Sequence, residues 1–377
     1  MSSPKRAMSS SYLEWAKLHS AATYNLATSG IQSYPLAALP LSVTDLEING
    51  PTVYGYEPLQ ERLARKSGVG AECVVVSNGT SMANHLAMAA ILEPGDDVLI
   101  EWPTYGLLLE VASYLGANIL RFERRMENGF AIDPDEIRRK ITPKTRLIIL
   151  TNLHNPSGAY TEDSIMIEIG RIAEEVGARV LVDEVYLDMM TDHIRQEGSG
   201  RAIQSCFHLG DQFVVTTSLT KAYGLSGIRC GWILADPGLA KRIWRLNDLF
   251  NATPSHPTEL LSVLALDHLE EIQSRARGLL GLNRKALNDF FCSRNDLEVV
   301  LPPAGTVAFP RLPSGRVEDF CAMLRRDFET SVVPGHFFEV PDHFRIGIGG
   351  DPEMTATGLI RLGNALDSFA MEMASHR

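Results

Sequence analysis

Short runs of Val, Ile and Leu recur along the chain from residue 73 onward, and amphipathic segments separate them. Seven of these runs are predicted to be strands: 73–77, 97–101, 118–122, 146–151, 179–183, 212–218 and 229–235. Helical patterns lie between them at 80–92, 104–115 and 162–176. Continuous apolar runs alternating with amphipathic helices are typical of a mostly parallel sheet that is covered on both faces. We therefore predict an α/β fold whose large domain holds a mostly parallel, seven-stranded sheet between helices.

The two ends of the chain have a different pattern from the middle. Residues 1–45 are rich in Ser, Ala and Pro, and we expect them to be irregular. A long helical pattern runs from about 257 to 291, and short strands mix with helices after it. We predict that residues 46–285 form the large domain. Residues 1–45 and 286–377 together are predicted to form a smaller α+β domain.

Composition and charge narrow the classes of function. The 377 residues include 45% hydrophobic and 21% charged residues, and the formal net charge is −11. An acidic protein of this kind is not expected to bind nucleic acid or an anionic membrane surface. No apolar run is long enough for a signal peptide or a membrane span, so we expect a cytoplasmic protein. The cysteines are scattered and form no CxxC pair, which predicts neither a disulfide framework nor a metal site: Cys73, Cys206, Cys230, Cys292 and Cys321.

Candidate binding residues gather where predicted strands end, which is where ligands bind in open α/β sheets. The stretch SNGTS places Gly79, Thr80 and Ser81 between a strand and a helix. Backbone N–H groups and two hydroxyls at a helix N-terminus could hold a phosphate. Ser and Thr are also common N-caps, so a capped helix is the better interpretation of these residues when they are taken alone.

Three further strand ends carry polar or aromatic residues. Asp183 of DEVY could pair with a protonated ring nitrogen, or it could cap a helix. Asn155 of NPSG could donate a hydrogen bond from a fixed turn, or it could belong to a turn with no other role. Trp102 and Tyr105 of WPTY could stack on a flat ligand, or they could pack in the core.

The stretch SLTKAYGLSGIR contains the strongest single candidate. Lys221 lies among small and apolar residues, with Ser218 before it and Arg229 after it. A lysine in a partly desolvated site beside another cation has a lowered pKa and becomes a nucleophile. A solvated loop lysine is hard to reconcile with these neighbours. We therefore interpret Lys221 as a functional residue, with Ser218 and Arg229 placed to hold a phosphate of the same ligand.

Taken in order, these motifs resemble a known family. NPSG, then DEVY with its Asp 28 positions after Asn155, then S-x-T-K and Arg229, resemble the fold-type I pyridoxal-phosphate enzymes, and more narrowly the class I/II aminotransferases. The motifs span residues 79–229, and the general pattern extends from about 45 to the C-terminus. The resemblance implies pyridoxal 5′-phosphate bound to the large domain, amino acid and 2-oxo acid substrates, and a homodimer with its active sites at the subunit interface.

The resemblance also assigns roles in binding the cofactor. Lys221 would hold it covalently, and Asp183 would keep its pyridine nitrogen protonated. Asn155 and Tyr186 would bond its phenolic oxygen, while Tyr105 would stack on the ring. The phosphate would be held by residues at two strand ends: Gly79, Thr80, Ser81, Ser218 and Arg229. Lys221, Asp183 and Tyr105 form the catalytic set that we expect.

Substrate and partner-subunit contacts are implied in the same way. Arg345 of FRIGIGG and Asn155 would bind the substrate α-carboxylate, although a surface salt bridge is an alternative for Arg345. Gly30 would let the backbone approach the substrate. In the family a tyrosine reaches the phosphate of the neighbouring subunit. The residue assigned here is Tyr54, which differs from the family pattern by standing immediately before Gly55.

The resemblance implies ping-pong transamination, in which Lys221 moves the α-proton as base and acid. Other reactions on the same scaffold remain open, namely C–S lysis, elimination and cyclisation. A regulatory protein of this fold is disfavoured because fewer than 50 residues precede the motif region and the charge is acidic. The segment 251–259 contains no arginine, which argues against a strictly acidic substrate. His154 could face the pocket or pack within its loop.

Overall fold

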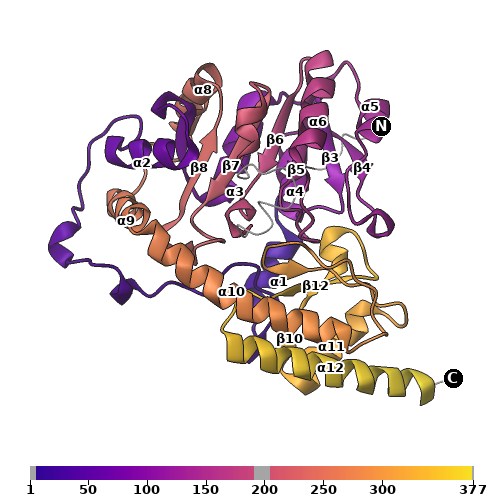
Figure 1. The fold of residues 1–377 in the computed structure, drawn as a ribbon. Helices are drawn as coiled ribbons and strands as arrows, with labels where there is room; N and C mark the ends of the chain where they lie inside the picture. Colours follow the sequence, from indigo (N-terminus) through magenta and orange to yellow (C-terminus); the bar gives the residue numbers. More distant parts are fainter. Residues whose placement is uncertain (1–5, 191–203, 376–377) are drawn as a thin grey trace.

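A computed structural model describes residues 6–190 and 204–375 (Figure 1). Its central feature is a seven-stranded sheet with the order β2-β8-β7-β6-β5-β3-β4. The strands are β2 (Val74–Asn78), β3 (Asp97–Trp102), β4 (Asn118–Glu123), β5 (Thr145–Thr151), β6 (Arg179–Asp183), β7 (Phe213–Ser218) and β8 (Cys230–Leu234). Only β8 is antiparallel to its neighbours, so the prediction of a mostly parallel sheet is confirmed.

Alternate residues of each strand enter two different cores. Val75 and Ile149 pack under one layer of helices, whereas Val76 and Ile148 pack under the other. The first layer is made of α3 (Gly79–Ile91), α4 (Gly106–Tyr114) and α8 (Pro237–Asn247). The second contains α2 (Glu57–Ser67), α5 (Pro134–Lys140) and α6 (Asp163–Glu175). Burial on both faces explains why the strands have continuous apolar sequences.

The carboxyl ends of the strands lie level with one another. The register pairs Thr151 of β5 with Asp183 of β6, and Asp183 with Thr216 of β7. Strand β2 runs parallel to β7 because both are antiparallel to β8, which lies between them. The segments that follow Asn78, Thr151, Asp183 and Ser218 therefore begin at one edge of the sheet.

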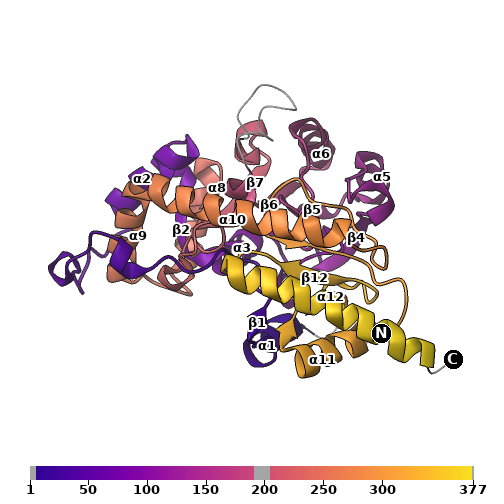
Figure 2. The same cartoon turned by 60° about the horizontal axis from the view of Figure 1, so that its bottom comes forward.

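The N-terminal and C-terminal parts of the chain lie together at this edge (Figures 1 and 2). Strand β1 (Tyr24–Asn25) pairs with β10 (Thr330–Ser331), and a small sheet has the order β11-β12-β9. Its strands are β9 (Val307–Ala308), β11 (Val333–Pro334) and β12 (Phe344–Gly347), with helices α10 (Leu269–Cys292), α11 (Val317–Phe328) and α12 (Pro352–Ser375). The exact domain limits, 46–285 for the large domain and 1–45 with 286–377 for the small one, stay a prediction.

One local expectation was wrong, and another needs more detail. Residues 1–45 contain a helix, α1 (Ser11–Leu18), which is capped by Ser10 and has no fully buried residue. Its eight residues are fewer than a clear helical period in the sequence requires. The helical pattern predicted from about 257 to 291 is confirmed, but it is divided into two helices, α9 (His256–Asp267) and α10, because the chain leaves helical geometry at His268.

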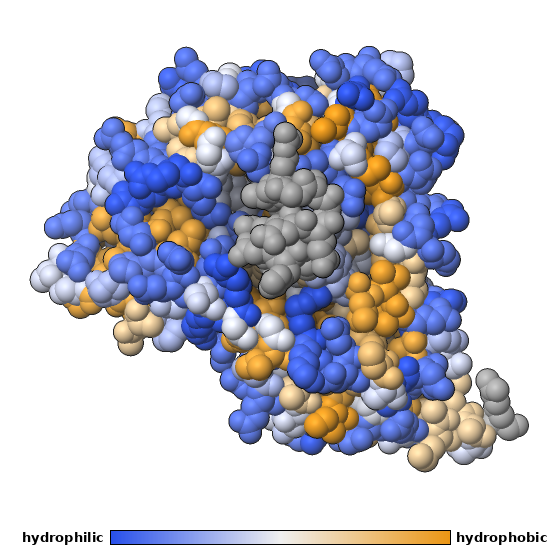
Figure 3. All heavy atoms as spheres, in the orientation of Figure 1, coloured by the Kyte–Doolittle hydropathy of each residue, from blue (hydrophilic) through white to orange (hydrophobic). Residues whose placement is uncertain are grey.

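Short 3₁₀ helices complete the connections: η1 (Leu36–Ala38), η2 (Val43–Asp45), η3 (Ala71–Cys73), η4 (Met126–Asn128), η5 (Leu187–Met189), η6 (Cys206–Leu209), η7 (Ser226–Ile228) and η8 (Gly335–Phe338). On the face in Figure 3, hydrophilic side chains predominate and hydrophobic ones gather in small patches. Within the described ranges, none of the helices combines the length and apolar character needed to cross a bilayer.

Candidate active site

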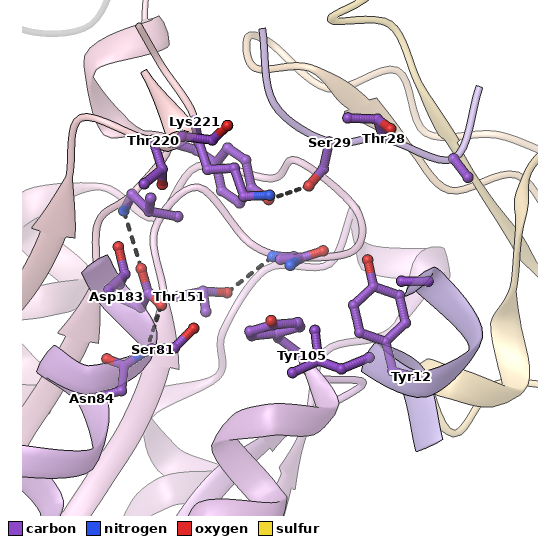
Figure 4. Close-up of a pocket in the computed structure, with 18 of the residues that line it drawn as sticks. Tyr12, Thr28, Ser29, Ser81, Asn84, Tyr105, Thr151, Asp183, Thr220 and Lys221 are labelled. Carbon is purple, nitrogen blue, oxygen red and sulfur yellow. Dashed lines mark hydrogen bonds between the residues drawn. The ribbon is translucent and has the colours of Figure 1, made fainter. Parts of the chain in front are cut away.

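A cavity of about 610 Å³ opens at the carboxyl edge of the sheet, between the strand ends and helix α1. Eight of the residues predicted for the site line this cavity: Thr80, Ser81, Tyr105, Asn155, Asp183, Tyr186, Lys221 and Arg229. They come from five different connections, so only the sheet brings them together. Figure 4 shows Lys221, Tyr105 and Asp183 around one space, with Tyr12 on the side opposite Asp183.

Lys221 follows β7 and extends into the cavity. Desolvation lowers the pKa of its ammonium group, and the positive charges of Arg345 and Arg229 lower it further. None of the described acidic groups lies within ion-pair distance of Lys221. Lys221 therefore loses its proton more readily than a surface lysine does. The neutral amine is the form that acts as a nucleophile or a proton acceptor.

Asp183 ends β6 and is almost completely buried. Its carboxylate accepts hydrogen bonds from Asn84 Nδ2 at 2.8 Å and from the Val185 N–H at 3.1 Å. Burial raises the pKa of Asp183 to about 6, and the hydrogen bond from Asn84 partly opposes that rise. A cationic partner in the cavity would stabilise the ionised form of this buried carboxylate.

Asn84 is a site residue that the sequence interpretation missed. It lies in α3, is 1% exposed, and accepts a hydrogen bond from Thr216 Oγ1 at 2.5 Å while donating to Asp183. Thr216 and Asn84 thus fix the orientation of the Asp183 carboxylate. A polar residue on the buried face of an otherwise apolar helix is a signal that could have identified it.

The N-terminus of α3 and the end of β7 form a polar cradle. Thr80 Oγ1 donates to Ser218 Oγ at 2.7 Å, and the Ser218 and Thr220 hydroxyls are 2.6 Å apart. Gly79 has φ +76°, and a Cβ there would overlap the guanidinium of Arg229. Hydroxyls, an arginine and the first N–H groups of a 13-residue helix are the donor set that a phosphate requires.

Arg345 lies in β12 and is completely buried. Its guanidinium donates to neutral acceptors only: Asn155 Oδ1 at 2.9 Å, the Tyr12 hydroxyl at 2.9 Å and the Ala27 carbonyl at 3.0 Å. Its Nε has no partner, and no acidic side chain among the described residues pairs with it. The surface salt bridge considered for Arg345 is therefore wrong. A buried, unpaired guanidinium is costly unless an anion joins it.

Aromatic hydroxyls surround the centre of the cavity. Tyr186 donates to Ser29 Oγ at 2.8 Å, and burial raises the pKa of Tyr186 to about 12. Burial raises the pKa of Tyr105 well above its ordinary value. Tyr12 of α1 packs edge-on against the Tyr105 ring with 5.7 Å between centroids. Tyr12 was missed because the segment that carries it was expected to be irregular.

The other predicted residues lie near the cavity or away from it. Ser218 lies behind Thr80 in the cradle. Gly30 packs against Lys221, where an added Cβ would come 3.3 Å from Lys221 Cδ. Tyr54 lies outside the cavity, is 44% exposed, and donates to Asp248 at 2.9 Å on the surface of its own chain. A role for Tyr54 in a neighbouring subunit stays a prediction.

A buried polar network supports the loop that carries Asn155. Glu101 accepts hydrogen bonds from the Thr151 N–H and Oγ1, and Thr151 Oγ1 accepts the N–H of Asn155 at 2.9 Å. Arg124 donates to Glu101 at 2.8 Å, yet burial still raises the pKa of Glu101. Through Thr151, which also lines the cavity, this network holds Asn155 in position.

His154 packs within the same loop and does not line the cavity. Its ring nitrogens lie 2.9 Å from the Pro103 carbonyl and 2.6 Å from Ser157 Oγ. Burial lowers its pKa well below the ordinary value, so its ring is neutral. In the part of the chain that is described, no group of three His, Cys, Asp or Glu side chains could hold a metal ion.

Comparisons with known proteins agree with this geometry. Residues 46–362 match the family model described as aminotransferase class I and II. Capreomycidine synthase of Streptomyces vinaceus is 27% identical over 92% of this chain and 90% of its own. A PLP-dependent aminotransferase from Streptococcus suis superposes with a TM-score of 0.88 at 28% identity, covering 98% of this chain and 99% of the other. The PLP-dependent cyclase OrfR, at 24% identity and a TM-score of 0.85, covers 97% and 98% and shares the fold.

Proposed function

Because the chain belongs to the class I and II aminotransferase family, we propose that it moves an amino group between an amino acid and a 2-oxo acid. The family and its PLP-dependent neighbour imply pyridoxal phosphate as the cofactor. The observation that carries the proposal is that two cationic side chains at one site have no acidic partner among the described residues. Lys221 lines the cavity without an ion-pair partner among the described residues, and Arg345 is buried behind it with its Nε unbonded.

The residues present fit pyridoxal phosphate. The cradle of Thr80, Ser218 and Arg229 has the donors for the phosphate, and a side chain at Gly79 would fill the space beside Arg229. Asp183 offers a buried carboxylate for the ring nitrogen. In the same proposal, Ser81 and Gly79 contribute backbone donors, Tyr105 stacks on the ring, and Asn155 with Tyr186 bonds the ring oxygen.

When bound, pyridoxal phosphate withdraws electrons from the α-carbon of the amino acid. The chain supplies the remaining chemistry. Arg345 binds the α-carboxylate and fixes the orientation of the α-carbon, with Asn155 beside it. Lys221, whose pKa is lowered by desolvation, takes the α-proton and returns it at a neighbouring position. Gly30 keeps the backbone close to Lys221, so the amine has a defined starting position.

Elimination, C–S lysis or cyclisation on the same site is the second candidate. It is supported by the similarity to capreomycidine synthase along most of the chain and by the shared fold of the OrfR cyclase. These reactions use the same Lys221, Asp183 and Arg345, so these side chains do not separate them from transamination. The products do.

A single-turnover experiment tests the proposal. The holoenzyme is mixed with each of the twenty standard L-amino acids in the absence of a 2-oxo acid, and the products are identified by mass spectrometry. Transamination predicts one equivalent of 2-oxo acid per site, with the amino group kept on the protein. Release of ammonia, a thiol or a cyclised amino acid would contradict transamination. Lys221→Ala should abolish turnover, while Lys285→Ala on the exposed face of α10 should not.

We also propose a cytoplasmic homodimer, as the family resemblance implies. Exposed apolar side chains gather on the segment before α2, which supports an interface there: Leu36, Val43, Ile48, Val53 and Tyr54. A dimer would give Tyr54 a route to the phosphate of the neighbouring site. Sedimentation of a fully active monomer would contradict this proposal.

A further inference from the structure

Helix α1 places one hydroxyl group beside the buried guanidinium of Arg345. The Tyr12 oxygen accepts a hydrogen bond from Arg345 Nη2 at 2.9 Å, so one of its lone pairs is used. Its own hydrogen has no acceptor among the described residues. Tyr12 also lines the cavity that contains Lys221, and its ring lies opposite Asp183 (Figure 4). A hydroxyl that accepts a hydrogen bond from a cation can still donate its own proton. It can therefore donate a hydrogen bond to an anion that the same cation binds.

Resting on the proposed function, we propose that the Tyr12 hydroxyl donates a hydrogen bond to the α-carboxylate of the amino acid that Arg345 binds. Tyr12 is then a substrate-binding residue supplied by helix α1. The carboxylate would accept hydrogen bonds from the Arg345 guanidinium and from the Tyr12 hydroxyl together.

The position of Tyr12 is well fixed for this role. Its ring packs against Tyr105, Phe337 and Phe338, with centroid distances of 5.7 to 5.9 Å. Ser10 caps the helix that carries it by accepting the Leu13 N–H. A side chain held on three sides loses little conformational entropy when a ligand arrives, so more of its hydrogen-bond energy appears as affinity.

The electrostatic surroundings of Tyr12 also favour an anion. Burial by itself would raise the pKa of Tyr12, but the charges of Arg345 and Lys221 outweigh it, so the pKa is lowered. A more acidic hydroxyl is a stronger donor to a carboxylate. Among the described residues that line the cavity, Asp183 carries the only carboxylate, and it lies on the other side.

The test compares two ligands in three proteins, namely the wild type, Tyr12→Phe and a control variant. Dissociation constants are measured by spectral titration of the holoenzyme with the L-amino acid that the wild type binds most tightly among the twenty standard ones. They are measured again with the primary amine that lacks only its carboxylate. The comparison is repeated with Tyr12→Phe, which keeps the ring contacts and removes the hydroxyl. Tyr114→Phe, on the half-exposed side of α4, is the matched control.

The proposal predicts that Tyr12→Phe weakens amino acid binding by about 10- to 100-fold, as expected for a lost hydrogen bond to a charged group. Binding of the amine should change little, and Tyr114→Phe should match the wild type with both ligands. If Tyr12→Phe weakens the binding of both ligands equally, Tyr12 only supports the structure. If it weakens the binding of neither, the Tyr12 hydroxyl does not contribute to binding. Both results overturn the proposal while leaving the proposed function intact. Failure of the wild type to bind any amino acid would overturn both.

Discussion

Replacing Asn84 by leucine should make the stability of the cofactor-free protein more dependent on pH. The Asn84 amide donates to the Asp183 carboxylate at 2.8 Å in a buried site. A hydrogen bond to an ionised group contributes about 1.5–3 kcal/mol and one to a neutral group about 1 kcal/mol. Their difference, about 0.5–2 kcal/mol, corresponds to about one pKa unit. Since the pKa of Asp183 is about 6, Asn84→Leu should raise it to roughly 7.

The sign follows from the direction of the shift. The pKa of Asp183 in the folded protein lies above the ordinary value of 3.8. Stability from a raised carboxyl pKa is therefore greatest at low pH and is lost as the pH rises through the folded value. In the wild type this loss should be on the order of 3 kcal/mol and should be complete near pH 7. In Asn84→Leu it should continue for about one further pH unit.

Urea unfolding of the cofactor-free proteins at pH 5 and pH 8 measures this effect. The difference in unfolding free energy between wild type and Asn84→Leu should be larger at pH 8 by about 0.5–2 kcal/mol. Titrations of all other groups cancel in that difference. Asn118→Leu removes an exposed contact to Asp97 and should show no such growth. A difference that is the same at both pH values would refute the assignment of Asn84 as the group that supports the ionised carboxylate.

Two other substitutions test the cradle and the buried network. Gly79→Ala forces a side chain into a left-handed backbone position and against Arg229, so it should cost more than about 1 kcal/mol and weaken cofactor binding in equilibrium dialysis. Gly227→Ala in the same region meets nothing within 4 Å, and affinity equal to that of Gly79→Ala would contradict this reasoning. Glu101→Gln leaves the buried Arg124 unpaired and should lower the unfolding free energy by about 3–5 kcal/mol. Glu298→Gln breaks an exposed pair with Arg311 and should cost under about 1 kcal/mol, so similar losses in the two variants would refute the role of burial.

The sequence was sufficient for the sheet and for the residues at its carboxyl edge. Strands buried on both faces leave continuous apolar runs, and the edge where they end is fixed by parallel topology. Asp183, Asn155 and Lys221 follow such runs directly, so their meeting in one cavity could be predicted. Arg345 was placed through the family resemblance and through its apolar neighbours.

The remaining site residues carry weaker signals. Asn84 lies in the middle of a helix, and only its polarity on a buried face marks it. Tyr12 lies on a short helix with no fully buried residue, so periodicity does not distinguish it from irregular chain. The contact between Tyr12 and Arg345 joins residues 333 positions apart, and it depends on how the N-terminal segment packs against β12. Local patterns contain no information about such contacts.

Lys221 is proposed to hold the cofactor covalently in the cavity and to release it when the incoming amino acid takes its place on the cofactor. Reductive trapping of the holoenzyme with borohydride, followed by peptide mass spectrometry, tests this claim directly. We expect one cofactor-sized mass on the peptide that contains Lys221, and this mass should be lost when the best amino donor is added before reduction. A modification on any other lysine, or an adduct on Lys221 that no amino acid removes, would contradict it.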